Sequence, residues 1–103
     1  MPFVVIGEGR ESKYIKLSAN TVNISKPLYS DDKIWVGRER VELLFDRENN
    51  LFGIRPISGV GGYKRQTGRV YCYKMPKDLP KGKFVASYDE QQKMIIADLN
   101  EEL

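Results

Sequence analysis

FDRENNL, residues 45–51, has a counterpart in YDEQQKM, residues 88–94. Each stretch begins with an aromatic residue and Asp, continues with charged or polar residues, and ends with Leu or Met. Residues that favour β-strands lie on both sides of each stretch, so each predicts a β-hairpin with the Asp in its turn. The recurrence has two interpretations: a duplicated unit, or residue preferences that hairpins in general share.

The chain length predicts a single domain covering residues 1–103, because this length is close to the most common domain size. Hydrophobic residues make up 41% of the chain, which is enough for one core. Residues 14–57 and 68–99 form repeat-like halves, and a glycine-rich connection at 58–68 joins them. The net charge of +3 permits an anionic partner without requiring one.

Alternation of apolar and polar residues predicts strands along most of the chain. Polar or proline-bounded segments near 29–32 and 75–80 allow at most one or two short helical turns. The acidic end at 98–102 is expected to fray in solvent. Besides the two hairpins, strands are expected at residues 3–6, 14–18, 21–25 and 69–73.

Two strand-plus-hairpin units can complete one another, because each has one apolar face and open edges that it cannot satisfy alone. We therefore predict a mainly β fold, a small barrel or sandwich built from these two repeats. Gly53 within its strand predicts a bulge or a close approach of the backbone, and Pro56 predicts the end of the ladder or an edge. The side chains expected in the shared core are Leu43, Phe45, Ile54, Phe84, Ala86, Tyr88 and Ile96.

The residue inventory argues against an enzyme. The chain has no His and a single Cys72, so it lacks an imidazole base, a Ser-His or Cys-His pair and the ligands of a common zinc site. We expect no cofactor, no metal and no disulfide. The start MPFVVIGEG lacks the features of a secretion signal, and no apolar run reaches the roughly 18 residues of a membrane span. A cytoplasmic protein that does not bind membranes is therefore expected.

The region before the second hairpin carries a resemblance to known regulators. Gly68-Arg69-Val70, Pro76-Lys77-Asp78-Leu79 and Lys81-Gly82-Lys83-Phe84-Val85 follow one another in the order of the pattern G-R-V-x-I-P-K-E-L and its hairpin. This order resembles the swapped-hairpin AbrB-like transcription regulators, and two copies in one chain resemble the MraZ-type proteins. The resemblance implies DNA binding. The chain departs from the pattern where Tyr73-Lys74-Met75 separates Cys72 from Pro76.

The first hairpin carries a second resemblance. Val41-Glu42-Leu43-Leu44-Phe45-Asp46 and Gly53-Ile54-Arg55-Pro56 are similar to a V-E-L-L-[FY]-D hairpin followed by I-G-[IL]-R-P. A group of small uncharacterised bacterial and phage proteins has this hairpin. The resemblance covers most of the chain and implies no activity.

Basic residues interleaved with tyrosines form the candidate binding site, since Lys and Arg neutralise phosphates and a tyrosine ring can stack on an unpaired base. The alternative is a solvated loop beside a strand whose tyrosines cover the core. The candidate nucleic-acid-binding residues are Tyr63, Lys64, Arg65, Arg69 and Lys74, with Tyr71 and Tyr73 nearby.

A second cluster places Lys33, Arg38 and Arg40 around Trp35. One interpretation is a second binding edge of the same kind. We expect instead that Trp35 is a core residue and that the two arginines form surface ion pairs, which contribute about 0 to 1 kcal/mol each. The expected acidic partners are Glu39, Glu42 and Asp46.

Two functions remain open from the sequence. The first is nucleic-acid binding as a DNA-binding regulator of the swapped-hairpin type. The alternative is a non-enzymatic protein-interaction or structural adaptor, encoded by a phage or mobile element, that adds an open strand edge to a partner's sheet. Exposed strand edges would also allow a homodimer.

Overall fold

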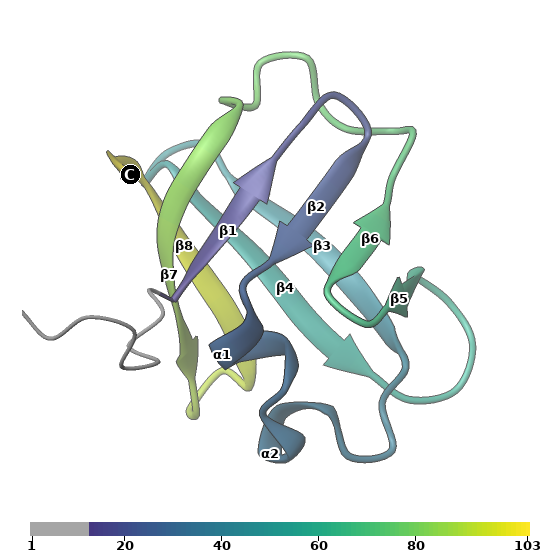
Figure 1. The fold of residues 1–103 in the computed structure, drawn as a ribbon. Coiled ribbons are helices and arrows are strands. Elements are labelled where there is room, and N and C mark those ends of the chain that lie inside the picture. The colour runs from purple at the N-terminus through teal and green to yellow at the C-terminus, as the bar shows by residue number, and fades with distance from the viewer. Residues whose placement is uncertain (1–12) are drawn as a thin grey trace, which may run out of the picture.

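The computed structural model describes residues 13–103, which form a closed antiparallel barrel of eight strands with two short helices (Figure 1). The fold is therefore mainly β, as the sequence predicts. The strand expected at 3–6 lies outside the described residues. The elements are β1 (Tyr14–Leu17), β2 (Thr21–Ile24), α1 (Lys26–Tyr29), α2 (Asp32–Trp35), β3 (Arg40–Asp46), β4 (Leu51–Ile57), β5 (Tyr63–Gln66), β6 (Arg69–Tyr71), β7 (Gly82–Asp89) and β8 (Met94–Glu102).

Around the barrel the strands follow the order β1-β2-β6-β5-β3-β4-β8-β7, and β7 closes the ring by pairing with β1. The two look-alike hairpins are β3-β4 and β7-β8. They lie side by side because β4 pairs with β8 (Figure 1). In this pairing Gly53 lies opposite Ile96, its counterpart in the repeat, so a local twofold axis relates the two hairpins. The predicted packing of the two units around one core is confirmed.

Both hairpins use the same turn. The Asp46 carboxylate accepts hydrogen bonds from the backbone and side chain of Asn49, and the Asp89 carboxylate accepts them from Gln91 and Gln92. The fourth residue after each Asp has a left-handed backbone, with φ of 56° at Asn50 and 54° at Lys93. Asn tolerates this conformation better than most residues, which is why the sequence predicts it for the Asn pair. Within that pair only Asn50 adopts it.

Inward-facing residues of all eight strands fill the barrel with one hydrophobic core. Ile54, Phe84 and Ala86 are buried as predicted, and Leu43, Phe45 and Tyr88 are partly buried against the core. The prediction for Ile96 is wrong, because alternation along β8 turns Ile95 and Ala97 inward and Ile96 outward. Burying a large apolar side chain such as Phe52 stabilises the fold by roughly 1.5 to 3 kcal/mol.

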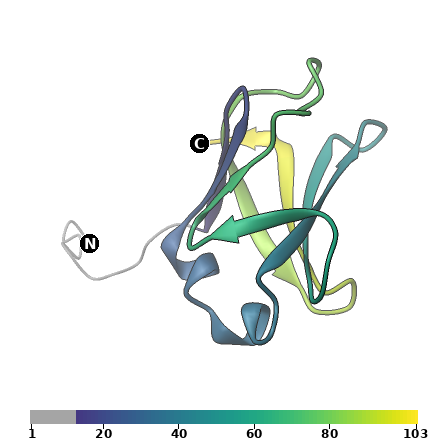
Figure 2. The ribbon, with the colours of Figure 1, turned by 90° about the vertical axis from the view of Figure 1, so that its right-hand side faces the viewer.

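The segment between β2 and β3 closes one end of the barrel, where α1 and α2 lie below the end of β2 in both views (Figures 1 and 2). Trp35 is only 7% exposed and donates a hydrogen bond from Nε1 to the Leu28 carbonyl oxygen, 2.8 Å away. Asp31 caps α2 by accepting a hydrogen bond from the backbone of Lys33. Trp35 is thus the core residue that the sequence predicts.

Three local expectations need correction. The glycine-rich connection at 58–68 contains a strand, β5, which pairs with β3 and β6. Gly53 makes no bulge with β3, and its role is to leave room for the Met94 side chain, whose Cε lies 3.0 Å from an added Cβ. The acidic end does not fray as expected, because β8 continues to Glu102. Pro56 does not end the ladder with β3, because it pairs with Val41, but it marks an edge as expected, because the pairing of β4 with β8 stops at Ile54.

Neither helix within residues 13–103 has the length and apolar character needed to cross a membrane.

Candidate nucleic-acid interface

A row of polar side chains crosses the outer face of β7, β1, β2 and β6. Lys16 lies opposite Lys83 on one side and opposite Asn23 on the other. Asn23 in turn lies opposite Arg69. The neighbours of each of these residues along its strand include buried core residues, so alternation directs all four side chains outward. We call Lys83, Lys16, Asn23 and Arg69 the basic row.

Tyrosine rings lie next to the cations of the basic row. The Lys83 ammonium lies 4.9 Å from the centre of the Tyr14 ring, a distance at which cation–π attraction acts. Arg69 donates hydrogen bonds to the Asn23 side-chain oxygen at 3.0 Å and to the Tyr71 hydroxyl at 3.2 Å. Tyr71 is 49% exposed and Tyr73 is 81% exposed, on either side of the buried Cys72. These two rings are therefore available to a ligand at the end of the row.

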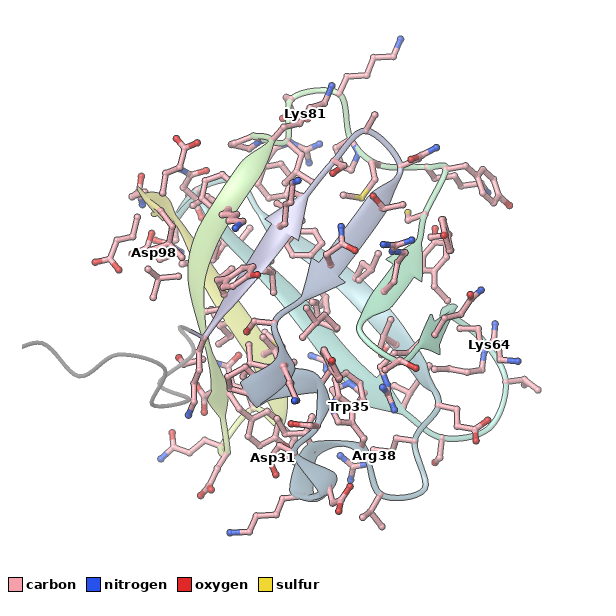
Figure 3. All side chains as sticks on the ribbon, in the orientation of Figure 1. Asp31, Trp35, Arg38, Lys64, Lys81 and Asp98 are labelled. Atoms are coloured by element: carbon pink, nitrogen blue, oxygen red, sulfur yellow. The ribbon has the colours of Figure 1, made fainter. Side chains whose placement is uncertain are left out.

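Charge is distributed unevenly around the barrel. Strands β1, β2, β5 and β6 contain no Asp or Glu, and the only acidic residue of β7 is Asp89, whose carboxylate is engaged in its turn. The remaining acidic residues of the strands lie on β3 and on β8, the strand that pairs with β7. Figure 3 shows one of them, Asp98, on the side away from Lys64. The basic row therefore faces solvent, and β1 and β2 at its centre carry no carboxylate. The acidic residues of β3 and β8 are Glu42, Asp46, Asp98, Glu101 and Glu102.

The structure separates the five candidate residues that the sequence groups. Arg69 lies in the basic row, and Lys64 is exposed on β5. Lys74 lies in the loop after β6, with its ammonium 5.9 Å from the centre of the Tyr73 ring. Tyr63 is partly buried against the core, where a hydrogen bond with Cys72 and burial raise the pKa of its hydroxyl.

Arg65 points toward the capped end of the barrel. Its guanidinium carbon lies 4.1 Å from the centre of the Trp35 ring, and Nη1 donates to the Thr67 carbonyl oxygen. Nε is buried and has no hydrogen-bond partner within residues 13–103. Burial lowers the pKa of the Arg65 guanidinium, and the negative charge of Glu39 acts in the opposite direction. Arg65 thus packs on Trp35 at the end of the barrel that α1 and α2 close, and it also contributes positive charge there.

A hollow of about 580 Å³ opens beside this stack, between α2, the residues that follow it and β5. Figure 3 shows Arg38 next to Trp35 at this end of the barrel and Lys64 farther out on β5. The hollow joins the two basic clusters that the sequence presents separately. The residues around it are Asp32, Trp35, Val36, Gly37, Arg38, Glu39, Arg40, Gly59, Lys64 and Arg65.

The ion pairs expected for the arginines of this hollow do not form. Arg40 donates from Nε and Nη2 to the carbonyl oxygens of Gly61 and Gly62, so it holds the glycine loop instead of a carboxylate. Glu42 pairs with Arg55 on the neighbouring strand, 3.5 Å away. Arg38 has no ion pair among the residues that the structure describes.

Scanning the chain against family models and searching curated proteins and solved structures give no match. Within residues 13–103 there is no group of three or more His, Cys, Asp or Glu residues placed to hold a metal ion.

Sequence reasoning missed Lys16 and Lys83. The alternation of residues 14–17 already directs Lys16 outward, away from the buried Ile15 and Leu17. The missing information was the pairing of β1 with β7, which are far apart in the chain. Only this pairing places the two lysines next to each other.

Proposed function

We propose that this protein binds single-stranded nucleic acid across the basic row, with bases stacked on Tyr71 and Tyr73. The observation that carries the proposal is the strand register. It aligns Lys83, Lys16 and Arg69 on one face beside exposed tyrosines, and the strands at the centre of that face contain no carboxylate. Cations that follow the backbone and rings that stack on bases are the usual elements of single-strand binding surfaces.

The size of the row matches a short stretch of nucleic acid. Adjacent strands lie about 4.8 Å apart, so the three strand-to-strand steps from Lys83 to Arg69 cover roughly 14 Å. The three cations along this length, Lys83, Lys16 and Arg69, can each neutralise one phosphate of a bound strand, so the row corresponds to about three phosphates. Stacking on an exposed tyrosine adds about 1 to 3 kcal/mol per base and requires that the base is unpaired. The tyrosines therefore favour a single strand over a duplex.

The resemblance to AbrB-like regulators extends the proposal to duplex DNA. A duplex would contact the basic row through its phosphates, with its bases unavailable to the tyrosines. A DNA-binding regulator should therefore bind duplex at least as tightly as single strand, and Tyr73→Ala should not change its affinity for duplex. Tighter binding of single strand than of duplex, with a smaller difference in Tyr73→Ala, supports single-strand binding instead.

Fluorescence anisotropy with labelled oligonucleotides of about 12 nucleotides tests the proposal. We expect binding that weakens as salt rises, and a clear loss of affinity in Lys16→Gln. Arg55→Gln is the matched control, because it also removes one cation but lies on β4, on the far side of the barrel from β2. No binding at low salt, or equal losses in the two variants, would contradict the proposal.

The adaptor alternative is supported by one feature of β3. The closed barrel uses most strand edges, but β5 pairs with β3 only at Arg40 and Val41. From Glu42 to Asp46 the other side of β3 has no strand partner within residues 13–103, and a hollow of about 300 Å³ with a mixed apolar and polar lining lies there. An adaptor that adds a strand to this edge should show no steep salt dependence. A proline at Leu44, which would interfere with strand addition, should abolish its partner binding.

A further inference from the structure

We infer that the hollow beside Trp35 binds a phosphate monoester, the group found at the 5′ end of a nucleic-acid strand and in free nucleotides. The assignment to a strand end rests on the proposed function, whereas binding of the phosphate monoester itself does not. At about 580 Å³ the hollow falls within the range of roughly 300 to 1,000 Å³ that is common for small-molecule sites.

The charges around the hollow suit a dianion. Its lining includes four basic side chains and two acidic ones, which leaves two positive charges in excess. Arg38 and Lys64 make no side-chain hydrogen bond or ion pair with the described residues, so their donors are available to a ligand. A phosphate monoester carries a charge of about −1.5 to −2 near pH 7. The basic residues are Arg38, Arg40, Lys64 and Arg65, and the acidic residues are Asp32 and Glu39.

Two of these arginines are already held in place. Contacts with the glycine carbonyl oxygens fix Arg40, and the stack on Trp35 fixes Arg65. Side chains fixed in advance lose less conformational entropy when a ligand binds. The Nε donor of Arg65 has no partner among the described residues, so the hydrogen bonds of its guanidinium are incomplete in the free protein. A nearby dianion would supply the missing acceptor.

The rim of the hollow offers an apolar contact next to the cations. Val36 is 73% exposed there, and Gly37 and Gly59 have open space around them. A sugar or base attached to the phosphate could rest on this rim without displacing a side chain. The ligand class is therefore a nucleoside monophosphate group rather than a bare inorganic ion.

The hollow and the basic row meet at the turn between β5 and β6. Arg65 lines the hollow, and the next residue, Gln66, pairs with Arg69 of the row. A second, smaller hollow of about 350 Å³ is lined by Asn23, Gln66 and Arg69 among others, so it lies beside the row and next in sequence to Arg65. A strand bound along the row can thus place its terminal phosphate beside Trp35.

The fluorescence of Trp35 tests the inference, because it is the only tryptophan in the chain. Three probes are titrated: a 5′-phosphorylated hexathymidylate, the same strand with a 5′ hydroxyl, and thymidine monophosphate. We expect the phosphorylated strand to bind at least about tenfold more tightly than the hydroxyl strand, as one charge-assisted contact allows. Arg38→Gln and Lys64→Gln should each remove most of this difference, while Arg55→Gln should leave it unchanged. Thermal melts confirm that the variants fold.

The outcomes separate this inference from the proposed function. Equal affinity for both strands, with no Trp35 response to thymidine monophosphate, overturns the inference and leaves the proposed function standing. If the two strands bind with equal affinity but thymidine monophosphate changes the Trp35 fluorescence, and this change requires Arg38 and Lys64, the hollow is a site for free nucleotides and not for a strand end. If neither strand binds, the proposed function fails, and the thymidine monophosphate titration alone decides whether the hollow binds a phosphate monoester.

Discussion

Replacing both lysines of the basic row with glutamine should flatten the salt dependence of single-strand binding. For single strands, the logarithm of the binding constant falls by about 0.7 per neutralised phosphate for each unit of log salt. If Lys16, Lys83 and Arg69 each neutralise one phosphate, the slope is about −2.1. Raising salt fourfold, from about 50 to 200 mM, then weakens binding about 20-fold.

The double variant Lys16→Gln with Lys83→Gln keeps only Arg69. Its slope should be about −0.7, so the same change in salt should weaken binding only about threefold. Both lysines are exposed, and the variant should melt at nearly the same temperature as the parent chain. Anisotropy titrations at four salt concentrations measure the slope, with Arg55→Gln as the control. An unchanged slope in the double variant would refute the assignment of the basic row.

Three further predictions concern stacking, the glycines and the turns. Tyr73→Ala should weaken single-strand binding by about 1 to 3 kcal/mol in the same titration without changing the melting temperature, because the ring is 81% exposed; an unchanged affinity contradicts stacking there. In urea unfolding, Gly62→Ala should cost more than about 1 kcal/mol and Gly53→Ala less. The added Cβ at Gly62 meets the Val41 carbonyl oxygen at φ +61°, whereas at Gly53 it meets only the end of the Met94 side chain; equal costs would contradict this reasoning. Hydrogen bonds from the Asn49 side chain and backbone lower the pKa of Asp46, and those from the Gln92 and Gln91 backbones lower that of Asp89. The stabilisation from these two carboxylates is therefore complete above the unfolded pKa of about 3.9 and is lost as pH falls through the folded pKa. Between about pH 5 and 2, the variant with both Asp46→Asn and Asp89→Asn should lose less of its free energy of unfolding than the parent does.

The hairpins and the class of fold could be predicted from local sequence. The aromatic-Asp turns at 45–51 and 88–94 form because the Asp carboxylate accepts hydrogen bonds from its own turn. That interaction involves residues only a few positions apart, so the sequence pattern contains all of it. The strand β5 could not be predicted in this way. It lies in a glycine-rich segment and pairs with β3 and β6, which other parts of the barrel hold in place.

The candidate site, too, could be predicted from the sequence only in part. Residue type and alternation indicate that Lys16, Lys64 and Arg69 are exposed cations, since each neighbours a buried or inward-facing residue along its strand. Residue type and alternation do not indicate that Arg65 stacks on Trp35, because that contact joins β5 to the helical segment between β2 and β3. The sequence therefore identifies which residues carry charge but not which surfaces they share.

By itself, the sequence determined that this protein is a mainly β domain with two matching hairpins, because strand alternation and Asp turns depend on neighbouring residues. Only the tertiary structure decided that Lys16 lies next to Lys83, and that Arg38 and Lys64 share one hollow. Those relations depend on how the eight strands close into a barrel. Closure is set by packing of the whole core and by pairing between distant segments, which no short stretch of residues encodes.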